Sequence, residues 1–226
     1  MLLKFPRKTF IAKCNLAGIR YNAVLSYNRR WFHFTGRNQE DILSTGSSSM
    51  EPAVKTSYAN ESPATADIMD DYEGAVQVAP NSFRDYGGRA RFSGEVETIK
   101  CFENNPLVRE RLTREDGTGK VLIVDGGGSL RRALMGDQIA AGAVQNRWRG
   151  VIINGAIRDS ALIAELPIGC KALGTMPLKS EKKVPGERDV PVSFAGLQFK
   201  PGQHVYADED GIVLSDKPLV VPKPAL

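Results

Sequence analysis

The segment from Lys120 to Ser160 constrains the fold more than any other part of the chain. It reads as an apolar run over 121–124, three glycines, a stretch with helical spacing over 138–148, and a second apolar run over 151–153. Apolar runs of this length are typical of strands buried on both faces, as in parallel sheets. A strand, a helix and a strand in this order predict a parallel crossover, and therefore a mixed α/β fold.

Further segments extend this pattern on both sides. We expect short helices starting near Ser62 and over Ser129–Ala133, 107–112 and 160–166, and strands over 92–102 and 170–173. Residues 177–189 are charged and contain Pro and Gly, which predicts an exposed loop. From Val190 to Leu214 the chain reads as short strands with a hairpin turn at Asp208–Gly211, so antiparallel strands should flank a largely parallel centre.

Composition excludes several classes of protein. A length of 226 residues, with 42% hydrophobic and 25% charged residues, suits a folded domain with a sizeable core. The apolar runs are far shorter than the roughly 18 residues that a membrane span needs, so we expect no membrane partner. Cys14, Cys101 and Cys170 are an odd number without paired spacing, which indicates reduced thiols rather than a disulfide framework or a zinc knuckle.

Positive charge is concentrated at the amino terminus. Residues 1–39 carry eight Lys and Arg and no acid, and subtracting these from the net charge of +4 leaves −4 for the rest. We therefore divide the chain into a basic extension, 1–53, and a folded domain, 54–226, and expect no direct binding of nucleic acid by the domain. An acid-poor, Arg-rich start is typical of an organellar transit peptide. A disordered extension and a true start at Met50 remain alternatives, so the expected location is cytoplasmic, or mitochondrial if the extension is a transit peptide.

Three charged residues flank the predicted crossover. Asp137 follows Gly136 at a helix start, and Arg158-Asp159 follows the strand over 151–153. Ligands of open α/β sheets gather at the carboxyl ends of strands. There Arg can clasp a carboxylate, and Asp is a hard oxygen ligand suited to Mg²⁺ or Mn²⁺. Alone, an Arg-Asp doublet is more typical of a surface pair, and Asp137 of an N-cap bonded to the amide of Ile139 or Ala140.

The glycine run Gly126–Gly128 allows two interpretations. Its amides could cradle an anion, or the run could form a tight turn without a ligand. It matches neither a dinucleotide-binding fingerprint nor a P-loop, so it does not predict nucleotide binding.

Four stretches carry a resemblance to a known family: DGGGSLRRALMGDQIA, WRGVIINGAIRD, PIGCKALGTMP and PGQHVYADEDGIVLS. Over roughly Thr65 to Ser215 the chain resembles the family that joins the regulator of ribonuclease activity A with the 4-hydroxy-4-methyl-2-oxoglutarate aldolases. The resemblance implies a swivelling β/β/α-type sandwich, α/β with a mixed sheet in a single domain. It also implies a homotrimer or a hexamer with sites between subunits. Enzymes of the family carry Asp, twenty residues, then Arg-Asp or Arg-Glu, and Asp137, Arg158 and Asp159 match that pattern.

The resemblance implies a metal-dependent lyase that cleaves a C–C bond of a 2-oxo acid through a pyruvate enolate. The substrates implied are 4-hydroxy-4-methyl-2-oxoglutarate and oxaloacetate. Asp159 would hold Mg²⁺ or Mn²⁺, Asp137 and Arg158 would be catalytic, with Asp137 orienting a water on the metal, and the substrate would be bound by Gly136, Gln138, Ile139 and Arg158. We expect no lysine at this centre, which favours the metal route over a Schiff base. The alternative is a non-catalytic regulator that inhibits a ribonuclease by protein–protein contact.

Overall fold

The computed structural model describes residues 9–16, 19–26, 62–80, 82–182 and 186–220. The chain forms two units, residues 1–53 and 54–226, and each is considered by itself. In the first, the antiparallel strands β1 (Thr9–Leu16) and β2 (Ile19–Ser26) form a hairpin that the sequence did not lead us to expect. The remaining interpretations of the amino-terminal segment fall mostly outside the described residues and stay predictions.

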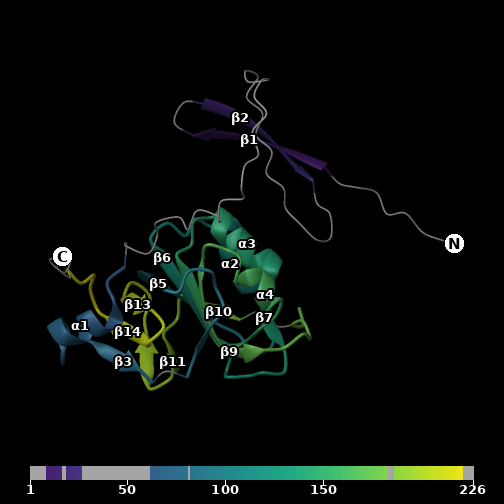
Figure 1. The fold of residues 1–226 in the computed structure, drawn as a ribbon. Helices are drawn as coiled ribbons and strands as arrows, with labels where there is room; N and C mark the ends of the chain where they lie inside the picture. The colour runs from purple at the N-terminus through teal and green to yellow at the C-terminus, as the bar shows by residue number, and fades with distance from the viewer. Residues whose placement is uncertain (1–8, 17–18, 27–61, 81, 183–185, 221–226) are drawn as a thin grey trace, which may run out of the picture. The chain divides into compact units, whose positions relative to one another are not determined.

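One large mixed sheet organises the second unit (Figure 1). Its central pairs β5–β6, β6–β8, β7–β8 and β8–β9 are parallel, and the pairs toward both edges are antiparallel, which confirms the predicted α/β class. The main path runs β3-β14-β13-β5-β6-β8-β9-β4, with β10 paired to β5 and β7 to β8. The strands are β3 (Gln77–Ala79), β4 (Arg84–Asp85), β5 (Phe92–Lys100), β6 (Lys120–Asp125), β7 (Ala133–Met135), β8 (Gly150–Ile157), β9 (Gly169–Thr175), β10 (Glu187–Arg188), β13 (His204–Ala207) and β14 (Ile212–Ser215).

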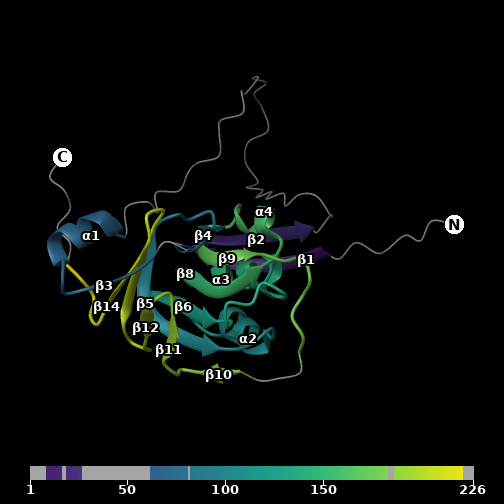
Figure 2. The same ribbon diagram turned by 90° about the horizontal axis from the view of Figure 1, so that it is seen from below.

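The sheet has a core on each face, as the apolar run over 121–124 predicted. Leu122 and Val124 of β6 pack into a core shared with helices α2 (Pro106–Arg114), α3 (Asp137–Gln145) and α4 (Ser160–Ile163). Val121 and Ile123 point to the other face and pack into a core shared with the hairpin β11–β12 (Val192–Phe194, Leu197–Phe199). This alternation gives the three layers of a β/β/α sandwich. Figures 1 and 2 show α1 (Thr65–Tyr72) at the opposite end of the domain from the other three helices.

Helices α2 and α3 pack closely because of one glycine. A Cβ on Gly142 would lie 2.6 Å from Cγ2 of Thr113, so only glycine lets the two helices approach this far. Pro106 occupies the first turn of α2, where its missing N–H costs no helical hydrogen bond. Helix α2 packs on the same face of the sheet as α3 and also contacts β7.

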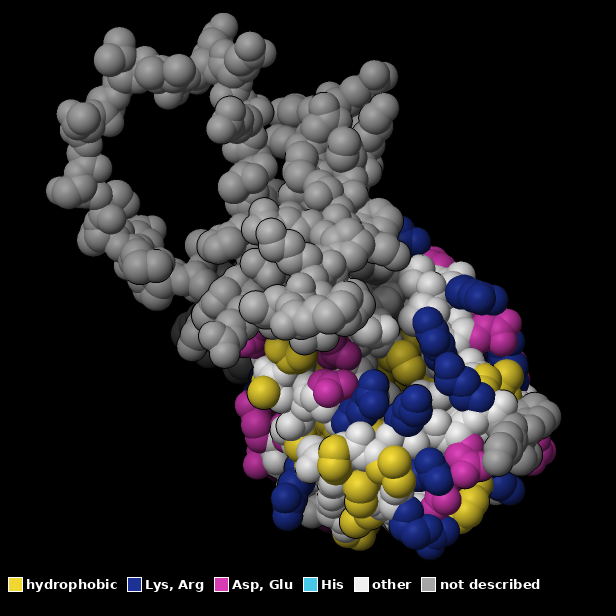
Figure 3. Space-filling model, turned by 90° about the vertical axis from the view of Figure 1, so that its right-hand side faces the viewer, with side chains coloured by type: hydrophobic (Ala, Val, Ile, Leu, Met, Phe, Trp, Pro, Cys, Tyr) yellow, Lys and Arg dark blue, Asp and Glu magenta, His cyan; other side chains and the backbone are white. Residues whose placement is uncertain are grey.

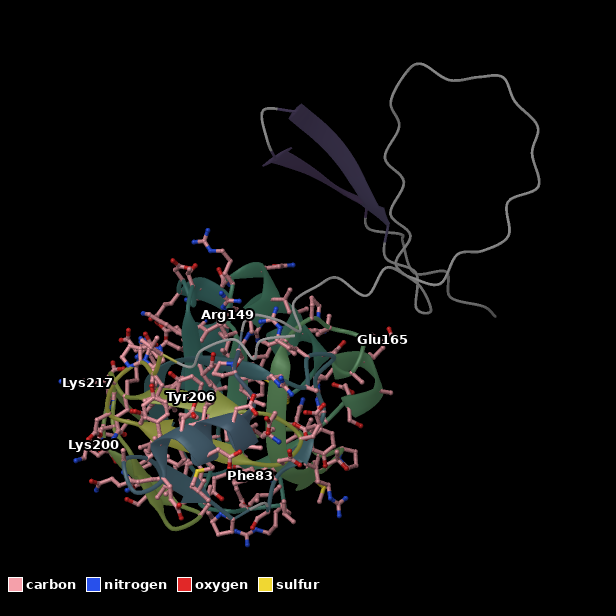
Figure 4. The ribbon with its side chains drawn as sticks, turned by 60° about the vertical axis from the view of Figure 1, so that its left-hand side comes forward. Phe83, Arg149, Glu165, Lys200, Tyr206 and Lys217 are labelled. Atoms are coloured by element: carbon pink, nitrogen blue, oxygen red, sulfur yellow. The ribbon has the colours of Figure 1, made fainter. Side chains whose placement is uncertain are left out.

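The hairpin turn at Asp208–Gly211 is confirmed, and its first residue also anchors α1. Asp208 accepts hydrogen bonds from the backbone N–H of Thr65 at 2.7 Å and from its hydroxyl at 2.6 Å. Ile68 of α1 packs beside Tyr206 of β13. Figure 4 labels Tyr206 next to α1. The carboxylate therefore fixes the start of α1, whose helix has no side-chain cap of its own.

One predicted helix is wrong. Residues 129–132 are not helical, and Ala133–Met135 is strand β7. Gly127 and Gly128 have φ of +64° and +68°, which turns the chain sharply after β6. The hydroxyl of Ser129, expected as a helix cap, donates instead to Glu103 at 2.6 Å. The chain can then re-enter the sheet as β7, beside the second half of β8.

The two described core thiols behave as the composition predicted. Cys101 and Cys170 are free and buried. Burial, helped by the charge of Asp125 near the first and of Asp85 near the second, raises the pKa of each thiol to about 12. Both are therefore unreactive thiols. Within the described part of the chain, no helix is long and apolar enough to cross a membrane.

Candidate active site

The register of β7 against β8 brings the predicted site residues together. The two strands are parallel, Met135 pairs with Ile157, and the N–H of Arg158 donates to the carbonyl of Met135 at 2.9 Å. Gly136 and Arg158, the residues that follow the two strands, therefore leave the sheet at the same place. The twenty residues between Asp137 and Arg158 hold α3 and β8, one crossover that returns the chain to this edge.

Gly136 lies against the Arg158-Asp159 pair. A Cβ at this position would lie 2.7 Å from Oδ2 of Asp159 and 3.0 Å from Nε of Arg158. The backbone of Gly136 is extended, with φ −134°, a conformation open to any residue. Space, and not backbone freedom, is thus the reason for glycine here.

Asp159 has an unusual backbone conformation. Asp159 adopts the left-handed region, with φ +56° and ψ +36°, and precedes the short helix α4. Its Oδ2 lies 3.2 Å from Nε of Arg158, and the two side chains are 36% and 39% exposed. Non-glycine residues in this region cost about 1–3 kcal/mol and concentrate at functional sites. Both side chains are therefore partly accessible to solvent.

The start of α3 contradicts the N-cap interpretation of Asp137. Gly136 is the N-cap, and the amides of Ile139 and Ala140 donate to its carbonyl at 3.1 and 3.0 Å. Asp137 is the first helical residue, and no side chain caps the helix. The Asp137 side chain therefore does not cap the helix, and it lines the pocket described next. The amide of Gln138 belongs to the first turn, where helical N–H groups have no partner within the helix.

A pocket of about 210 Å³ opens at this place. Five of the six predicted residues line it, and Asp159 stands beside it through its contact with Arg158. Two further residues shape the pocket wall through backbone contacts: Asn105 donates to the carbonyl of Leu134 at 2.9 Å, and Ser180 to that of Ala133 at 2.6 Å. The complete lining is Asn105, Arg109, Thr113, Ala133, Met135, Gly136, Asp137, Gln138, Ile139, Arg158, Lys179, Ser180 and Lys182.

Sequence reasoning missed the basic part of this wall. Arg109 comes from α2, and Lys179 and Lys182 come from the segment that we interpreted only as an exposed loop. The expectation that no lysine lies at the centre is therefore wrong. The one available signal was the position of Lys179, just beyond β9 at the carboxyl edge of the sheet. Figure 3 views the side of the molecule on which Figure 1 labels β7 and β9, and Lys and Arg side chains gather across that face.

The glycine run proves to be a tight turn. The amides of Gly126 and Gly128 donate to the carbonyl of Asn154 at 3.0 and 3.1 Å, and that of Gly127 to the carboxylate of Asp125 at 3.0 Å. The amide of Ser129 donates to the carbonyl of Gly126 at 3.3 Å. All four amides have partners within the turn, which leaves no cradle for an anion.

The donor set at Asp159 fits a loosely held divalent ion. Mg²⁺ commonly takes one or two protein carboxylates and completes its shell with water and substrate. A half-exposed Asp159 beside a pocket that also contains Asp137 meets that need. Among the described residues, no group of three or more His, Cys, Asp and Glu could hold a metal, so a closed zinc site is not supported there.

Residues 63–214 match the model of the RraA-like family, described as Aldolase/RraA. The chain belongs to the RraA-like family. The predicted resemblance is thereby confirmed, and the matched range contains the whole pocket of this RraA-like domain.

Three relatives illustrate the range of names within the family. A protein of Stutzerimonas stutzeri, provisionally named 4-hydroxy-4-methyl-2-oxoglutarate aldolase, is 49% identical over 159 residues, which cover 70% of this chain and 98% of the relative. The structure of the RNA-processing inhibitor RraA from Thermus thermophilis is 46% identical, with a TM-score of 0.67, and covers 70% of this chain and 95% of its own. A Geobacillus kaustophilus structure named as an S-adenosylmethionine:2-dimethylmenaquinone methyltransferase is 46% identical, with a TM-score of 0.68, and covers 71% and 99%. Relatives of similar identity thus carry different names, and the residues of the RraA-like pocket must decide between them.

Proposed function

We propose that the protein is a divalent-metal-dependent carbon–carbon lyase that cleaves 4-hydroxy-4-methyl-2-oxoglutarate and decarboxylates oxaloacetate. The observation that carries this proposal is the convergence of Asp137 and Arg158 on one pocket, with Asp159 in contact with Arg158. A cation, a proton-transferring carboxylate and a metal-ligating carboxylate are the groups that such a cleavage needs. The name of the 49% identical relative agrees with this choice.

Arg158 would bind the 2-oxo acid and stabilise the transition state. Its guanidinium can hold the keto oxygen and the adjacent carboxylate, assisted by the amide of Gln138 at the start of α3. As the C–C bond breaks, negative charge grows on the keto oxygen, and a fixed cation there lowers the barrier. A divalent ion at Asp159 would supply Lewis-acid polarisation of the same 2-oxo group.

Asp137 would move the proton at the reacting carbon. In aldol cleavage the C4 hydroxyl would give its proton to Asp137 through a water, C4 would become the carbonyl carbon of one pyruvate, and the C3–C4 electron pair would remain on C3 of the other, a pyruvate enolate. In decarboxylation the same bond breaks and CO₂ leaves. In both cases C3 must gain a proton, and Asp137 can deliver it through a water held in the pocket.

The decisive experiment measures pyruvate release from both substrates with Mg²⁺, with Mn²⁺ and with EDTA. We expect metal-dependent turnover that falls about 10²–10³-fold in Arg158→Ala, the scale seen when one group that stabilises transition-state charge is removed. Asp159→Asn should require far more metal for the same rate. Arg147→Ala and Asp116→Asn remove an exposed ion pair elsewhere and should leave the rate unchanged. Wild-type protein with no turnover above the rate of free metal would refute the proposal.

The lysines in the pocket call for a separate test of the mechanism. Lys179 and Lys182 are exposed, whereas a Schiff-base lysine is commonly activated by desolvation in a buried site. Borohydride added during turnover should therefore leave the protein mass unchanged. A substrate-dependent mass increase on either lysine would replace the metal route with a covalent one.

We also propose that subunits meet next to this pocket, as a homotrimer or a hexamer. Four exposed apolar side chains follow the carboxyl ends of the parallel strands β5, β6, β8 and β9, a pattern typical of an interaction surface. They are Phe102, Leu130, Leu162 and Leu178, and they are 58%, 47%, 51% and 51% exposed. Sedimentation equilibrium should give a molecular mass of three or six times 24.7 kDa.

A second candidate function is inhibition of an RNA-processing ribonuclease by direct contact. It is favoured by the 46% identical structure that is named as such an inhibitor. Addition of the purified protein to a ribonuclease assay tests it, with Arg158→Ala in parallel. Inhibition that survives in this variant would show that the regulatory surface does not depend on the proposed catalytic site.

A further inference from the structure

A second group of basic residues lies at the end of the sheet opposite the candidate active site. Arg149 directly precedes β8, whereas Arg158 directly follows it. At about 3.3 Å per residue, the eight residues of β8 separate these two arginines by roughly 25 Å. Near Arg149 there is a hollow of about 190 Å³, called here the basic hollow, which is lined by Arg89, Arg91, Arg149 and His204 together with Ser62, Phe92, Ser93, Gly94 and Gly119.

The backbones that carry these basic residues are fixed by the fold. The amide of Arg89 donates to the carbonyl of Ile168 at 3.2 Å, and that of Arg149 to the carbonyl of Lys120 at 2.9 Å. His204 is the first residue of β13, within the large sheet. Only side chains therefore need to be ordered when a ligand enters the basic hollow, which keeps the entropic cost of binding small.

The charge of the basic hollow has one sign. None of its described lining residues is Asp or Glu, and a carboxylate near it, Asp208, lies 4.0 Å from Nε of Arg91. Burial lowers the pKa of His204 below its ordinary value, although the charge of Glu95 opposes this, so the imidazole is mostly neutral at pH 7 and can donate one hydrogen bond. The positive charge comes from three arginines, which repel one another around so small a volume, and an anion bound among them would offset that repulsion.

A second, more apolar hollow adjoins the first. It has a volume of about 360 Å³, and Arg89, Gly119 and Arg149 line both hollows. Figure 4 labels Arg149, one of these shared residues. The other residues that line the second hollow are Thr118, Val144, Arg147, Trp148 and Pro167. A ligand with its charged group in the basic hollow would therefore have room for a partly apolar body beside it.

We propose that the basic hollow binds the dianionic phosphate group of a small phosphomonoester, whose body lies in the adjoining hollow. Guanidinium groups match the oxygens of a phosphate with paired hydrogen bonds, and a dianion balances several positive charges better than one carboxylate does. Inorganic phosphate offers the same group without the body, so the two sources differ in affinity. This site is separate from the pocket at the start of α3 and does not rest on the proposed lyase function.

Titration calorimetry of the full chain, in a phosphate-free buffer of low ionic strength, tests this site. The probes are phenyl phosphate, inorganic phosphate and acetate, and we expect their affinities to fall in that order. In Arg149→Ala, the affinity for phenyl phosphate should fall roughly 10–100-fold, the scale of one charge-assisted hydrogen bond. Arg149→Lys keeps the charge without the planar fork and should recover only part of the affinity. Phenyl phosphate should also raise the unfolding temperature of the wild type more than that of Arg149→Ala.

Two further variants separate this site from other sources of binding. Arg158→Ala changes the pocket at the start of α3, and Arg84→Ala removes an exposed positive charge from β4. Both should leave the affinity for phenyl phosphate within about twofold, because changes at distant sites are independent.

Four results would contradict the proposal. Loss of binding in Arg158→Ala with full binding in Arg149→Ala would place the anion in the candidate active site instead. Equal losses in Arg84→Ala and Arg149→Ala would indicate a general effect of net charge. Absence of binding by both phosphates in the wild type would remove the site altogether. Equal affinities for phenyl phosphate and inorganic phosphate would overturn the assignment of the adjoining hollow to the body of the ligand.

Discussion

Helix α2 presents two arginines, two residues apart, to different surroundings. Arg111 is 8% exposed and lies among carboxylates, with Glu97 at 3.1 Å, Glu115 at 2.8 Å and Asp189 at 2.5 Å. Arg109 is exposed and lines the candidate active site, where the neighbouring charges are mostly of its own sign. Because i and i+2 point to different sides of a helix, one element serves two purposes.

The difference shows that charge density alone does not identify a functional site. Burial alone would lower the pKa of Arg111, but the hydrogen bond to Asp189 and the charges of Glu97 and Glu115 raise it above its ordinary value. The ion pairs of that cluster join α2 to β5 and to the segment after β10. The pocket around Arg109, by contrast, has one carboxylate, Asp137, among its lining residues.

The first prediction concerns stability, where we expect the largest effect. Arg111→Ala would remove the cation shared by three carboxylates and leave Glu97, 13% exposed, with Lys120 at 2.6 Å as its remaining partner, so it should lower the free energy of unfolding by about 2–4 kcal/mol. Urea denaturation measures this. The matched variant Arg109→Ala should change the same quantity by less than about 0.5 kcal/mol.

These two variants test directly whether Arg111 is structural and Arg109 functional. If Arg109→Ala destabilises the protein as much as Arg111→Ala, then Arg109 is a structural residue, and its place in the pocket says nothing about substrate. Pyruvate release by Arg111→Ala, assayed well below its unfolding temperature, should match that of the wild type.

The second prediction concerns the contact between Gly136 and the Arg158-Asp159 pair. Gly136→Ala would place a methyl group 2.7 Å from Oδ2 of Asp159 and force both side chains to move. Displacements near 1 Å at reacting groups can cost about 10²-fold in rate, so we expect a loss of roughly 10–100-fold in kcat/KM. The displaced side chains are partly exposed, so the free energy of unfolding should fall by less than about 1 kcal/mol.

Gly211→Ala is the control for Gly136→Ala. A Cβ at Gly211 would meet nothing closer than the carbonyl of Ala79 at 4.0 Å, so activity and stability should both be retained. Full activity in Gly136→Ala would show that the pair does not need the close backbone approach, and would weaken its proposed catalytic role.

The sequence was most informative where an uninterrupted apolar run or a fixed residue spacing pointed to one element. The apolar runs over 121–124 and 151–153 predicted β6 and β8, and the Asp137–Arg158 spacing matched a crossover that begins and ends at one sheet edge. It failed at Ser129–Ala133, because the positive φ of two glycines, and not local propensity, decides where the chain re-enters the sheet. It also missed Arg109, since that residue reaches the pocket only through the tertiary packing of α2 beside β7.

The third and smallest effect concerns Asp208, a carboxylate whose partners are complete. Its side chain is 2% exposed and accepts from Thr65, from the amide of Asp210 at 3.1 Å and from that of Gly211 at 3.4 Å. Burial alone would raise the pKa of Asp208, but these hydrogen bonds outweigh it and hold the pKa below its ordinary value. A carboxyl with a lowered folded-state pKa adds stability above its unfolded pKa, and that stability is lost as the pH falls through the folded value.

Asp208→Asn should therefore cost about 1–2 kcal/mol of unfolding free energy at pH 7, and the difference from the wild type should shrink from about pH 4 downward. Urea denaturation across a pH series measures it. Asp137→Asn, at a carboxylate that lines the pocket, should change the free energy of unfolding at pH 7 by less than about 0.5 kcal/mol. An equal loss in both variants at pH 7 would mean that Asp137 is also a structural anchor, as fully engaged within the fold as the carboxylate that fixes the start of α1.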